Sequence, residues 1–555
     1  MNQDRAQRPT TRHGKDSPLG VRRLSRAGWR WCVAIVASAV VASLSLAPST
    51  LGASGESQAV GPQNLTSALA AIENQSRYAQ ATWGYEALNQ NSGEVLASQN
   101  ANSMFDPGST MKIYSTATAL RLYGPNYRFT TPVYRDGPIS GTTLNGDLVL
   151  VGSGDLSLGL RDQPNGSMYY ENAPDFNQSY ANIGLPGAVE PPGNPFAGLN
   201  QMAAQVRASG ITEVNGNVTV DDTLFTPYNG FPDGNISPIW VNENLIDALV
   251  TPGSVGQAAS VSWRPMTAQY TVANDVTTVA AGGSTSLQIT EQTPGALVVT
   301  GTIAAGSAPT LVVHEVADPA AFARSAFIEA LQQAGVTVKA SSGGPNPPLP
   351  PQKGGYEVPA NMVGKYVSLP LSQFINLILK VSYNRGADLM TCLASVKMGS
   401  TDCEQGLVAE LATITGLGIP SQSVFPLDGA GSDDQGRTTV GALAQFLRRV
   451  ASTSYGPTMH QSLPVLGRNG TVANVLSHSP AAGHVALKTG NRAVGSVTNQ
   501  LMLLGNSLAG HIETKSGHQV TFMIVVGNVP LKSPSDVLTI TDEQAQMVEA
   551  MYDHL

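Results

Sequence analysis

Cysteine and histidine are too few and too scattered in this chain to form a recognisable metal site. The 555 residues include three cysteines and eight histidines. There is no Cys-x-x-Cys pair, no zinc-like cysteine spacing and no His-x-His or His-Glu-x-x-His motif. We therefore predict that the protein has no metal site.

Charged residues are also scarce, at 13% of the chain, and they are unevenly distributed. Residues 1–55 carry eight Lys and Arg against two Asp, whereas the remainder carries 23 basic and 37 acidic residues. An acidic body repels phosphate backbones, which argues against nucleic-acid binding. The 42% of hydrophobic residues is enough for a packed core and excludes wholesale disorder. The length suggests three or four domain-sized units.

The N-terminal region is typical of an export segment. A basic stretch ends at Arg30, and residues 31–47 then carry no charge before Pro48. Positive charge before this run and none after it predicts an N-terminus inside the cell and a body outside. The run fits a signal cleaved near Leu51-Gly52-Ala53 or a retained anchor, and both remain open. Membrane association is expected only through this segment, if it is uncleaved.

Two cysteines remain in the exported body, Cys392 and Cys403, eleven positions apart. One disulfide and two buried free thiols are both compatible with this spacing.

The rest of the chain contains helical and strand patterns separated by Gly- and Pro-rich loops. Residues 82–98 predict a β-hairpin, and residues 144–151 and 520–529 predict buried strands. Residues 109–123, 372–381 and those after Arg385 predict helices. Residues 200–217 and 321–340 each predict a helix, a glycine and a strand, as in an α/β unit. Residues 341–355 hold five prolines and predict a linker.

Three short motifs carry the chemistry. In Ser109-Thr110-Met111-Lys112, positions three apart share a helix face, so the Lys112 amine can reach the Ser109 hydroxyl. A serine needs a base to act as a nucleophile, and lysine qualifies when burial lowers its pKa. The start of a helix also directs backbone N–H groups toward an oxyanion.

The second and third motifs follow far downstream. Ser382-Tyr383-Asn384 supplies a hydroxyl that can relay a proton and an amide that can hold a carbonyl. Lys488-Thr489-Gly490 follows an apolar strand pattern, where lysine and threonine can bind a carboxylate and glycine leaves room for a substrate backbone. The order S-x-x-K, S-x-N, K-T-G in one exported chain is more specific than any one motif.

In these motifs the chain resembles the class C penicillin-binding proteins, the three-domain D-alanyl-D-alanine carboxypeptidase/endopeptidases of bacterial cell walls. The 270 positions between Lys112 and Ser382 match the large insertion of this class. Further runs resemble the family, and they lie at residues 120–125, 127–129, 146–155, 428–431, 463–465 and 470–471. Gly152-Ser153-Gly154 lacks the third glycine of a dinucleotide loop, since Ser157 stands there.

The resemblance implies an α+β fold, with a β-lactamase/transpeptidase-like penicillin-binding domain of antiparallel sheet and helices. Inserted α/β and β-rich domains would interrupt it. The penicillin-binding domain would comprise residues 56–135 and 345–555, and residues 136–344 would form the inserted region, as two small domains. Residues 1–55 would form the tail and export segment.

The resemblance also implies an acyl-enzyme mechanism. Ser109 would attack the carbonyl of the penultimate D-Ala, and Lys112 would take its proton. Ser382 and Lys488 would pass a proton to the departing D-Ala, and Asn384 would orient the substrate and Lys112. Water would then hydrolyse the ester without a metal or other cofactor.

The third motif would bind the end of the substrate. Lys488 and Thr489 would hold the terminal carboxylate beside Gly490, and the backbone N–H groups of Ser109 and Asn491 would form the oxyanion hole. The implied partners are peptidoglycan stem peptides and β-lactam antibiotics, in the extracytoplasmic envelope. Asn491 and Arg492 replace the usual threonine after this motif, so carboxylate recognition is expected to differ.

Two other functions remain as alternatives. A non-catalytic wall scaffold with a relic penicillin-binding site predicts that at least one motif has eroded, and all three are intact. A β-lactamase would need a dedicated deacylating glutamate, and nothing in the sequence marks one. The motifs do not separate carboxypeptidase from endopeptidase activity.

Overall fold

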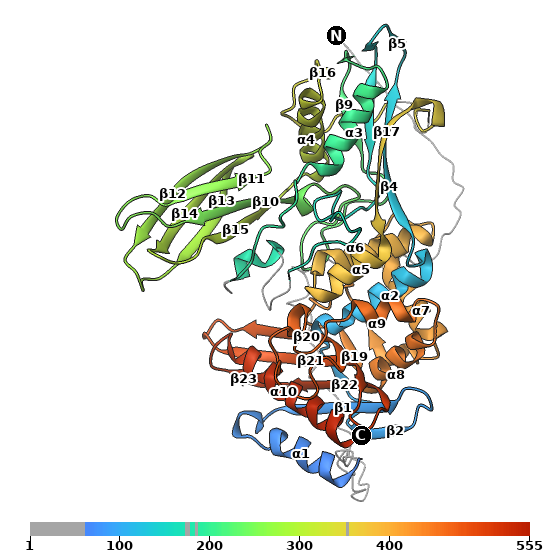
Figure 1. Ribbon diagram of the computed structural model, residues 1–555, viewed down its shortest axis with the longest axis vertical. Coiled ribbons are helices and arrows are strands. Elements are labelled where there is room, and N and C mark those ends of the chain that lie inside the picture. The colour runs from blue at the N-terminus through green and yellow to red at the C-terminus, as the bar shows by residue number, and fades with distance from the viewer. Residues whose placement is uncertain (1–60, 172–177, 184–186, 351–354) are drawn as a thin grey trace, which may run out of the picture. The chain divides into compact units, whose positions relative to one another are not determined.

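The computed structural model describes residues 61–171, 178–183, 187–350 and 355–555 (Figure 1). The predictions for the basic tail and for the uncharged run at 31–47 concern residues outside this part. Among the described helices, none combines the length and the apolar character needed to cross a bilayer.

Segments from opposite ends of the described chain form one six-stranded antiparallel sheet. Its order is β2-β1-β22-β21-β20, and β23 also pairs with β21. The predicted hairpin at 82–98 is confirmed as β1 and β2, and β1 pairs with β22 over eight residues. The strands are β1 (Thr82–Asn89), β2 (Val95–Gln99), β20 (Val485–Gly495), β21 (Leu501–Glu513), β22 (Gln519–Gly527) and β23 (Val529–Leu531).

The alternation of side chains along β22 gives this sheet two buried faces. Phe522, Ile524 and Val526 belong to the core shared with helices α1 and α10. Met523 and Val525 belong to the core shared with helix α8. The helices are α1 (Gln63–Glu73), α8 (Val440–Ala451) and α10 (Asp536–His554), and Figure 1 shows α1 and α10 beside each other.

A helical layer packs on the α8 side of the sheet and holds the first two motifs. Its further helices are α2 (Lys112–Tyr123), α5 (Leu371–Lys380), α6 (Asn384–Lys397), α7 (Gln405–Gly416) and α9 (Gly456–Ser462). The predicted helices at 109–123 and 372–381 and after Arg385 are therefore present. Helix α2 is buried over its first nine residues, because it lies between α5, α6 and α7.

A disulfide joins Cys392 on α6 to Cys403, just before α7. Both residues are fully buried in the helical core. The structure thus chooses the disulfide over the two free thiols that the spacing also allowed.

Two four-stranded sheets, built mostly from the middle of the chain, share a hydrophobic core with two helices. The predicted helix–glycine–strand units are confirmed, since α3 leads through Gly210 to β8 and α4 leads through Gly335 to β16. The sheets are β17-β4-β7-β9 and β16-β8-β6-β5. The helices are α3 (Ala197–Ala208) and α4 (Pro319–Gln333). The strands are β4 (Arg128–Asp136), β5 (Ile139–Ser140), β6 (Thr143–Leu144), β7 (Asp147–Val151), β8 (Glu213–Val214), β9 (Val218–Asp221), β16 (Thr337–Val338) and β17 (Met362–Pro370).

The first of these sheets joins residues on both sides of the predicted domain boundaries at 135 and 345. Strand β4 ends at Asp136 and pairs with β7 on one side and with β17 on the other. The predicted strand at 144–151 is split into β6 and β7 at Asn145-Gly146. Only glycine fits at position 146, because a Cβ there would lie 1.9 Å from the carbonyl oxygen of Asp136.

Two three-stranded sheets complete the middle of the chain and pack through a small apolar core. They have the orders β11-β10-β15 and β12-β14-β13. Their strands are β10 (Leu245–Thr251), β11 (Ser260–Arg264), β12 (Thr271–Val279), β13 (Ser286–Thr293), β14 (Ala296–Ala304) and β15 (Thr310–Glu315). Together these sheets and helices confirm the α+β class with α/β and β-rich insertions.

Candidate active site

The first motif lies on a tight turn that runs directly into a buried helix. Ser109 belongs to the 3₁₀ turn η3 (Gly108–Met111), and Lys112 is the first residue of α2. The Nζ atom of Lys112 lies 2.8 Å from the Oγ atom of Ser109. Gly108 has a φ of +50° and packs so closely that a Cβ would lie 2.6 Å from the backbone nitrogen of Asn491. The turn that carries the serine is therefore held against strand β20.

Lys112 is fully buried and its amine has three close oxygen neighbours. Besides Ser109, Nζ lies 2.5 Å from Oδ1 of Asn384 and 2.8 Å from the carbonyl oxygen of Ala430. Burial lowers the pKa of Lys112 to about 8, although nearby carboxylates act in the opposite direction. A substantial share of this lysine is therefore the free amine at mildly alkaline pH.

The second motif lies at the junction of α5 and α6. Ser382 has a φ of +59°, in the left-handed region that a serine rarely adopts, and Asn384 is the first residue of α6. The Tyr180 hydroxyl donates to the carbonyl oxygen of Ser382 at 2.6 Å and accepts from the backbone N–H of Asn384 at 3.0 Å. The Tyr180 hydroxyl therefore links the backbones of Ser382, which is strained, and Asn384. The Tyr383 side chain is buried beside Glu243 and does not join the site.

The third motif lies on β20, as the sequence predicted. The Nζ atom of Lys488 donates to Oγ of Ser382 at 2.8 Å and to the carbonyl oxygen of Thr489 at 2.7 Å. Burial, reinforced by the charge of Lys112, holds the pKa of Lys488 well below its ordinary value. The Thr489 hydroxyl lies 3.2 Å from that of Thr471. Each lysine of the site therefore faces one serine.

Gly490 is required by packing. A Cβ at this position would lie 2.2 Å from the carbonyl oxygen of Pro107 and 2.8 Å from the backbone nitrogen of Thr110. From its place in the third motif, this glycine is expected to leave room for a substrate backbone. The structure adds that it lets the turn with Ser109 approach β20. Asn491 follows on the same strand and is exposed.

A profile of the D-Ala-D-Ala carboxypeptidase 3 (S13) family matches residues 65–551, which is most of the chain. The chain belongs to this family. The resemblance drawn from the three motifs is thereby confirmed, and the chain is a serine peptidase of the D-Ala-D-Ala carboxypeptidase type.

Individual relatives of this S13 family chain agree. It is 27% identical over 431 residues to a D-alanyl-D-alanine carboxypeptidase of Actinomadura sp., covering 73% of this chain and 72% of the relative. The crystal structure of penicillin binding protein 4 from Haemophilus influenzae matches with a TM-score of 0.64 at 18% identity, covering 87% of this chain and 99% of that one. Its complex with a β-lactam matches with a TM-score of 0.62 at 18% identity over the same shares. These structures establish the shared fold.

Several residues that shape the candidate site were not predicted as site residues from the sequence. Ala430 belongs to the run 428–431, which the sequence marks only as a resemblance to the family. Asp428 accepts the backbone N–H groups of Gly431 and Ser432, at 2.5 and 3.0 Å, and so shapes the turn that presents the Ala430 carbonyl to Lys112. Asp388 accepts the N–H of Gly429 at 3.0 Å. Local patterns could not identify these roles, because the Ala430 carbonyl meets Lys112 across 318 positions and Asp388 meets Gly429 across 41.

The middle of the chain contributes two further side chains, Tyr180 and Asp233. The Nδ2 atom of Asn384 donates to Oδ1 of Asp233 at 2.8 Å. Asp233 lies in a Gly- and Pro-rich loop, 151 positions before Asn384, with no motif around it. No sequence signal would have marked it.

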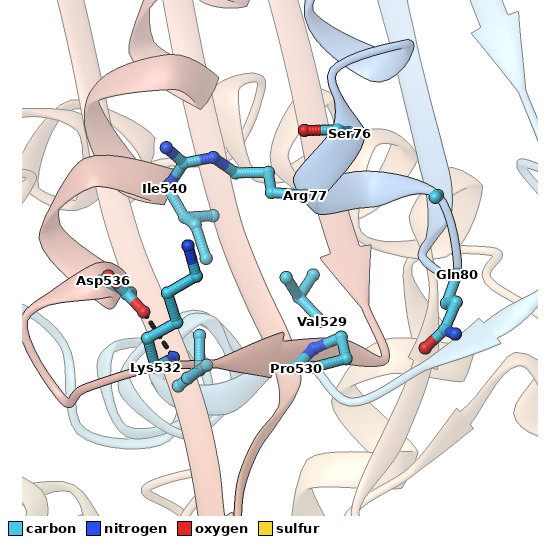
Figure 2. Close-up of a pocket in the computed structure, with 10 residues that line it drawn as sticks. Ser76, Arg77, Gln80, Val529, Pro530, Lys532, Asp536 and Ile540 are labelled. Carbon is cyan, nitrogen blue, oxygen red and sulfur yellow. Dashed lines mark hydrogen bonds between the residues drawn. The ribbon is translucent and has the colours of Figure 1, made fainter.

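A separate cavity of about 440 Å³ lies away from these groups, between η2 (Ser76–Tyr78), β23 and the start of α10. Figure 2 shows Arg77, Lys532 and Asp536 around it, and the backbone N–H of Lys532 donates to Asp536. None of the predicted site residues lines this cavity. In the described part of the chain, no group of three or more His, Cys, Asp or Glu side chains is arranged to hold a metal ion.

Proposed function

We propose that this chain hydrolyses the terminal D-Ala-D-Ala bond of peptidoglycan stem peptides through an acyl-enzyme on Ser109. The observation that carries the proposal is the pairing of each serine with a buried lysine. Lys112 lies 2.8 Å from Ser109, and Lys488 lies 2.8 Å from Ser382. Family membership gives the reaction class, and this geometry supports the roles that we propose for the four residues.

In the acylation step, the free amine of Lys112 takes the proton of Ser109 while Oγ bonds to the carbonyl carbon of the penultimate D-Ala. The C–N bond to the terminal D-Ala then breaks. Ser382 donates a proton to the leaving nitrogen and is reprotonated through its hydrogen bond with Lys488. Lys112 thus gains the proton of Ser109 and Lys488 loses the one that passes through Ser382 to the leaving nitrogen, so the two lysines together carry the same number of protons before and after acylation. Return of one proton from Lys112 to Lys488 restores the starting state.

The substrate is oriented by groups along β20 and at the start of α6. Lys488 and Thr489 hold the terminal carboxylate, and Asn384 orients the substrate and Lys112. The backbone N–H groups of Ser109 and Asn491 stabilise the oxyanion. Water then attacks the ester, releases the shortened peptide and returns a proton to Ser109. A β-lactam, which carries an acylating carbonyl in place of the D-Ala-D-Ala bond, acylates the same serine.

The experiment that tests this function is covalent labelling of the full chain with a fluorescent penicillin. We expect wild type to be labelled and Ser109→Ala to be unlabelled, while Ser452→Ala, at an exposed serine on the C-terminal end of α8, labels normally. Labelling that persists in Ser109→Ala would place the nucleophile at another serine. A folded wild type without label and without release of D-Ala would favour the scaffold alternative.

The leaving group distinguishes carboxypeptidase from DD-endopeptidase activity, and we propose that the site serves both. In the first the amine is free D-Ala, and in the second it is the cross-linking amine of a neighbouring stem. Mass spectrometry after incubation with linear pentapeptide stems and with cross-linked stem dimers separates them. Release of D-Ala without cleavage of dimers would restrict the function to the carboxypeptidase.

We propose that the body of the protein lies in the extracytoplasmic envelope of a bacterium. The expected substrate is a cell-wall peptide, and the disulfide between Cys392 and Cys403 suits an oxidising compartment. Protease digestion of intact spheroplasts should degrade the body. Protection from protease would contradict this location.

We also propose that residues 56–135 and 345–555 form the peptidase domain and residues 136–344 an inserted region. Support comes from the six-stranded sheet and its helical layer, which draw on the two outer segments. Strands β4 and β17 would then be the connection through which the inserted region is attached.

A further inference from the structure

Asp233 approaches the catalytic groups from the region that we propose as an insertion. Its Oδ1 atom accepts the hydrogen bond from Nδ2 of Asn384 at 2.8 Å. Its other carboxylate oxygen, Oδ2, is buried and has no hydrogen-bond partner among the described residues. Among the described residues, the one hydrogen bond of this carboxylate therefore comes from the amide of Asn384, which in turn contacts Lys112.

The neighbours of Lys112 match the requirements of a free amine that acts as a base. A neutral amine has two N–H donors and one lone pair. The carbonyl oxygens of Asn384 and Ala430 lie 2.5 and 2.8 Å from Nζ and accept the two N–H groups. The lone pair is then left for the hydroxyl proton of Ser109, whose Oγ lies 2.8 Å away.

This arrangement holds only in one orientation of the Asn384 amide. An ionised carboxylate accepts hydrogen bonds and donates none, so Asp233 requires the NH₂ group of Asn384 to face it. The amide oxygen then faces Lys112. In the reversed orientation, the NH₂ group would point at Nζ and compete with Ser109 for the lone pair.

We propose that Asp233 is a positioning residue that fixes the amide orientation of Asn384 and so directs the lone pair of Lys112 at Ser109. The proposal rests on the proposed function and gives the middle of the chain a role in the reaction itself. Among the described contacts, Asp233 makes no hydrogen bond to Ser109 or Lys112, and its positioning effect acts through Asn384.

Charge gives a second, measurable consequence of Asp233. Lys112 faces Asp233, Asp388 on α6, Asp428 in the turn before β19 (Arg437–Thr439), and Lys488 on β20. The negative charge of Asp233 raises the pKa of Lys112 against the effect of burial. Loss of this charge should therefore lower the pKa of Lys112 and move the rising limb of the pH profile to lower pH.

The experiment measures the second-order rate of acylation by fluorescent penicillin across pH, with the full chain. Asp233→Asn preserves side-chain shape but removes the charge and allows both amide orientations. We expect a loss on the order of 10²-fold in acylation rate, as for other small misplacements of a catalytic group. The rising limb should also move to lower pH. Asp275→Asn, at an exposed aspartate on β12, is the control and should match wild type.

A double-mutant cycle separates positioning from general destabilisation. In an Asn384→Ala background, Asp233→Asn should cause almost no further loss in the plateau rate of acylation, because the amide that it orients is gone. The rising limb should still move to lower pH, because the charge of Asp233 acts on Lys112 directly. Asp233→Glu keeps the charge and should retain the wild-type pH midpoint, and it serves in place of Asp233→Asn if that variant does not fold.

The outcomes distinguish this inference from the proposed function. If wild type is acylated but Asp233→Asn keeps the wild-type rate and pH profile, the positioning role is wrong and the function stands. An undiminished loss in the Asn384→Ala background would also overturn it. If wild type itself is not acylated on Ser109, the proposed function fails first.

Discussion

Nζ of Lys488 lies 2.8 Å from Oγ of Ser382, and Nζ of Lys112 lies at the same distance from Oγ of Ser109. Both lysines are fully buried, and the charge of Lys112 contributes to the lowered pKa of Lys488. Two neighbouring buried ammonium groups repel each other, so at least one of Lys112 and Lys488 is favoured as the free amine. That is the condition under which lysine can replace histidine as a base.

Replacing Lys112 with arginine should abolish most activity while keeping a positive charge in place. Arginine does not lose its proton in proteins, so it cannot take the proton of Ser109. We expect the acylation rate to fall by about 10²- to 10⁴-fold, the usual contribution of a general base. Lys365→Arg, at an exposed lysine on β17, should leave the rate unchanged. A Lys112→Arg variant with wild-type acylation would assign the base to another residue.

The acylation rate of wild type should increase with pH around the pKa of Lys112, which is about 8. In the proposed mechanism the base is the deprotonated amine, and its fraction grows as the pH rises through the pKa. The rate should therefore be low below this pH and level off above it. Stopped-flow labelling from pH 6 to 10 checks this, and a rate that falls over that range would be inconsistent with lysine as the base.

Gly490→Ala should separate the nucleophile turn from β20. The new methyl group would meet backbone atoms of Pro107 and Thr110, which cannot move away as a side-chain end can. We expect a loss of about 1–3 kcal/mol in the free energy of unfolding, together with reduced acylation. The matched control is Gly495→Ala on the same strand, where the nearest atom, a methyl carbon of Leu501, lies at an ordinary 3.6 Å. Equal effects of the two substitutions, in thermal melts and labelling, would refute the packing argument.

Tyr180→Phe should lower kcat more than it raises KM. The variant loses the hydroxyl that donates to Ser382 and accepts from the N–H of Asn384. An unsatisfied backbone group costs about 1–3 kcal/mol, and the strained Ser382 is then free to relax. Steady-state release of D-Ala from a stem peptide measures both constants. Tyr169→Phe, at a tyrosine eleven positions earlier that makes none of the described site contacts, is the comparison.

Reduction of the disulfide should destabilise the helical layer. Cys392 and Cys403 close a loop of eleven residues, for which loop entropy alone corresponds to about 3 kcal/mol. We expect the melting temperature to fall on addition of a phosphine reductant. The Cys392→Ala/Cys403→Ala double variant should melt lower from the start and should not respond to the reductant. A wild type that melts at the same temperature as the double variant would show that the bridge does not stabilise the helical layer.

Local pattern in the sequence determined the elements and the reaction class. The hairpin of β1 and β2, the two helix–glycine–strand units and the helix with Lys112 all follow from side-chain periodicity and turn residues, which act within a few residues. The three motifs and their order identified the family, because S-x-x-K, S-x-N and K-T-G each keep their chemistry within three or four positions.

Only the tertiary structure shows which residues of these separate motifs and elements contact one another. The sequence does not show that Lys112 meets Asn384 across 272 positions, or that Ala430 turns its carbonyl to the same amine. The sequence did not decide whether Cys392 pairs with Cys403, and it gave no indication that Asp233 lies near the candidate site. Such contacts depend on how whole helices and sheets pack, and packing is set by the sum of many distant apolar contacts. No short window of residues contains that information.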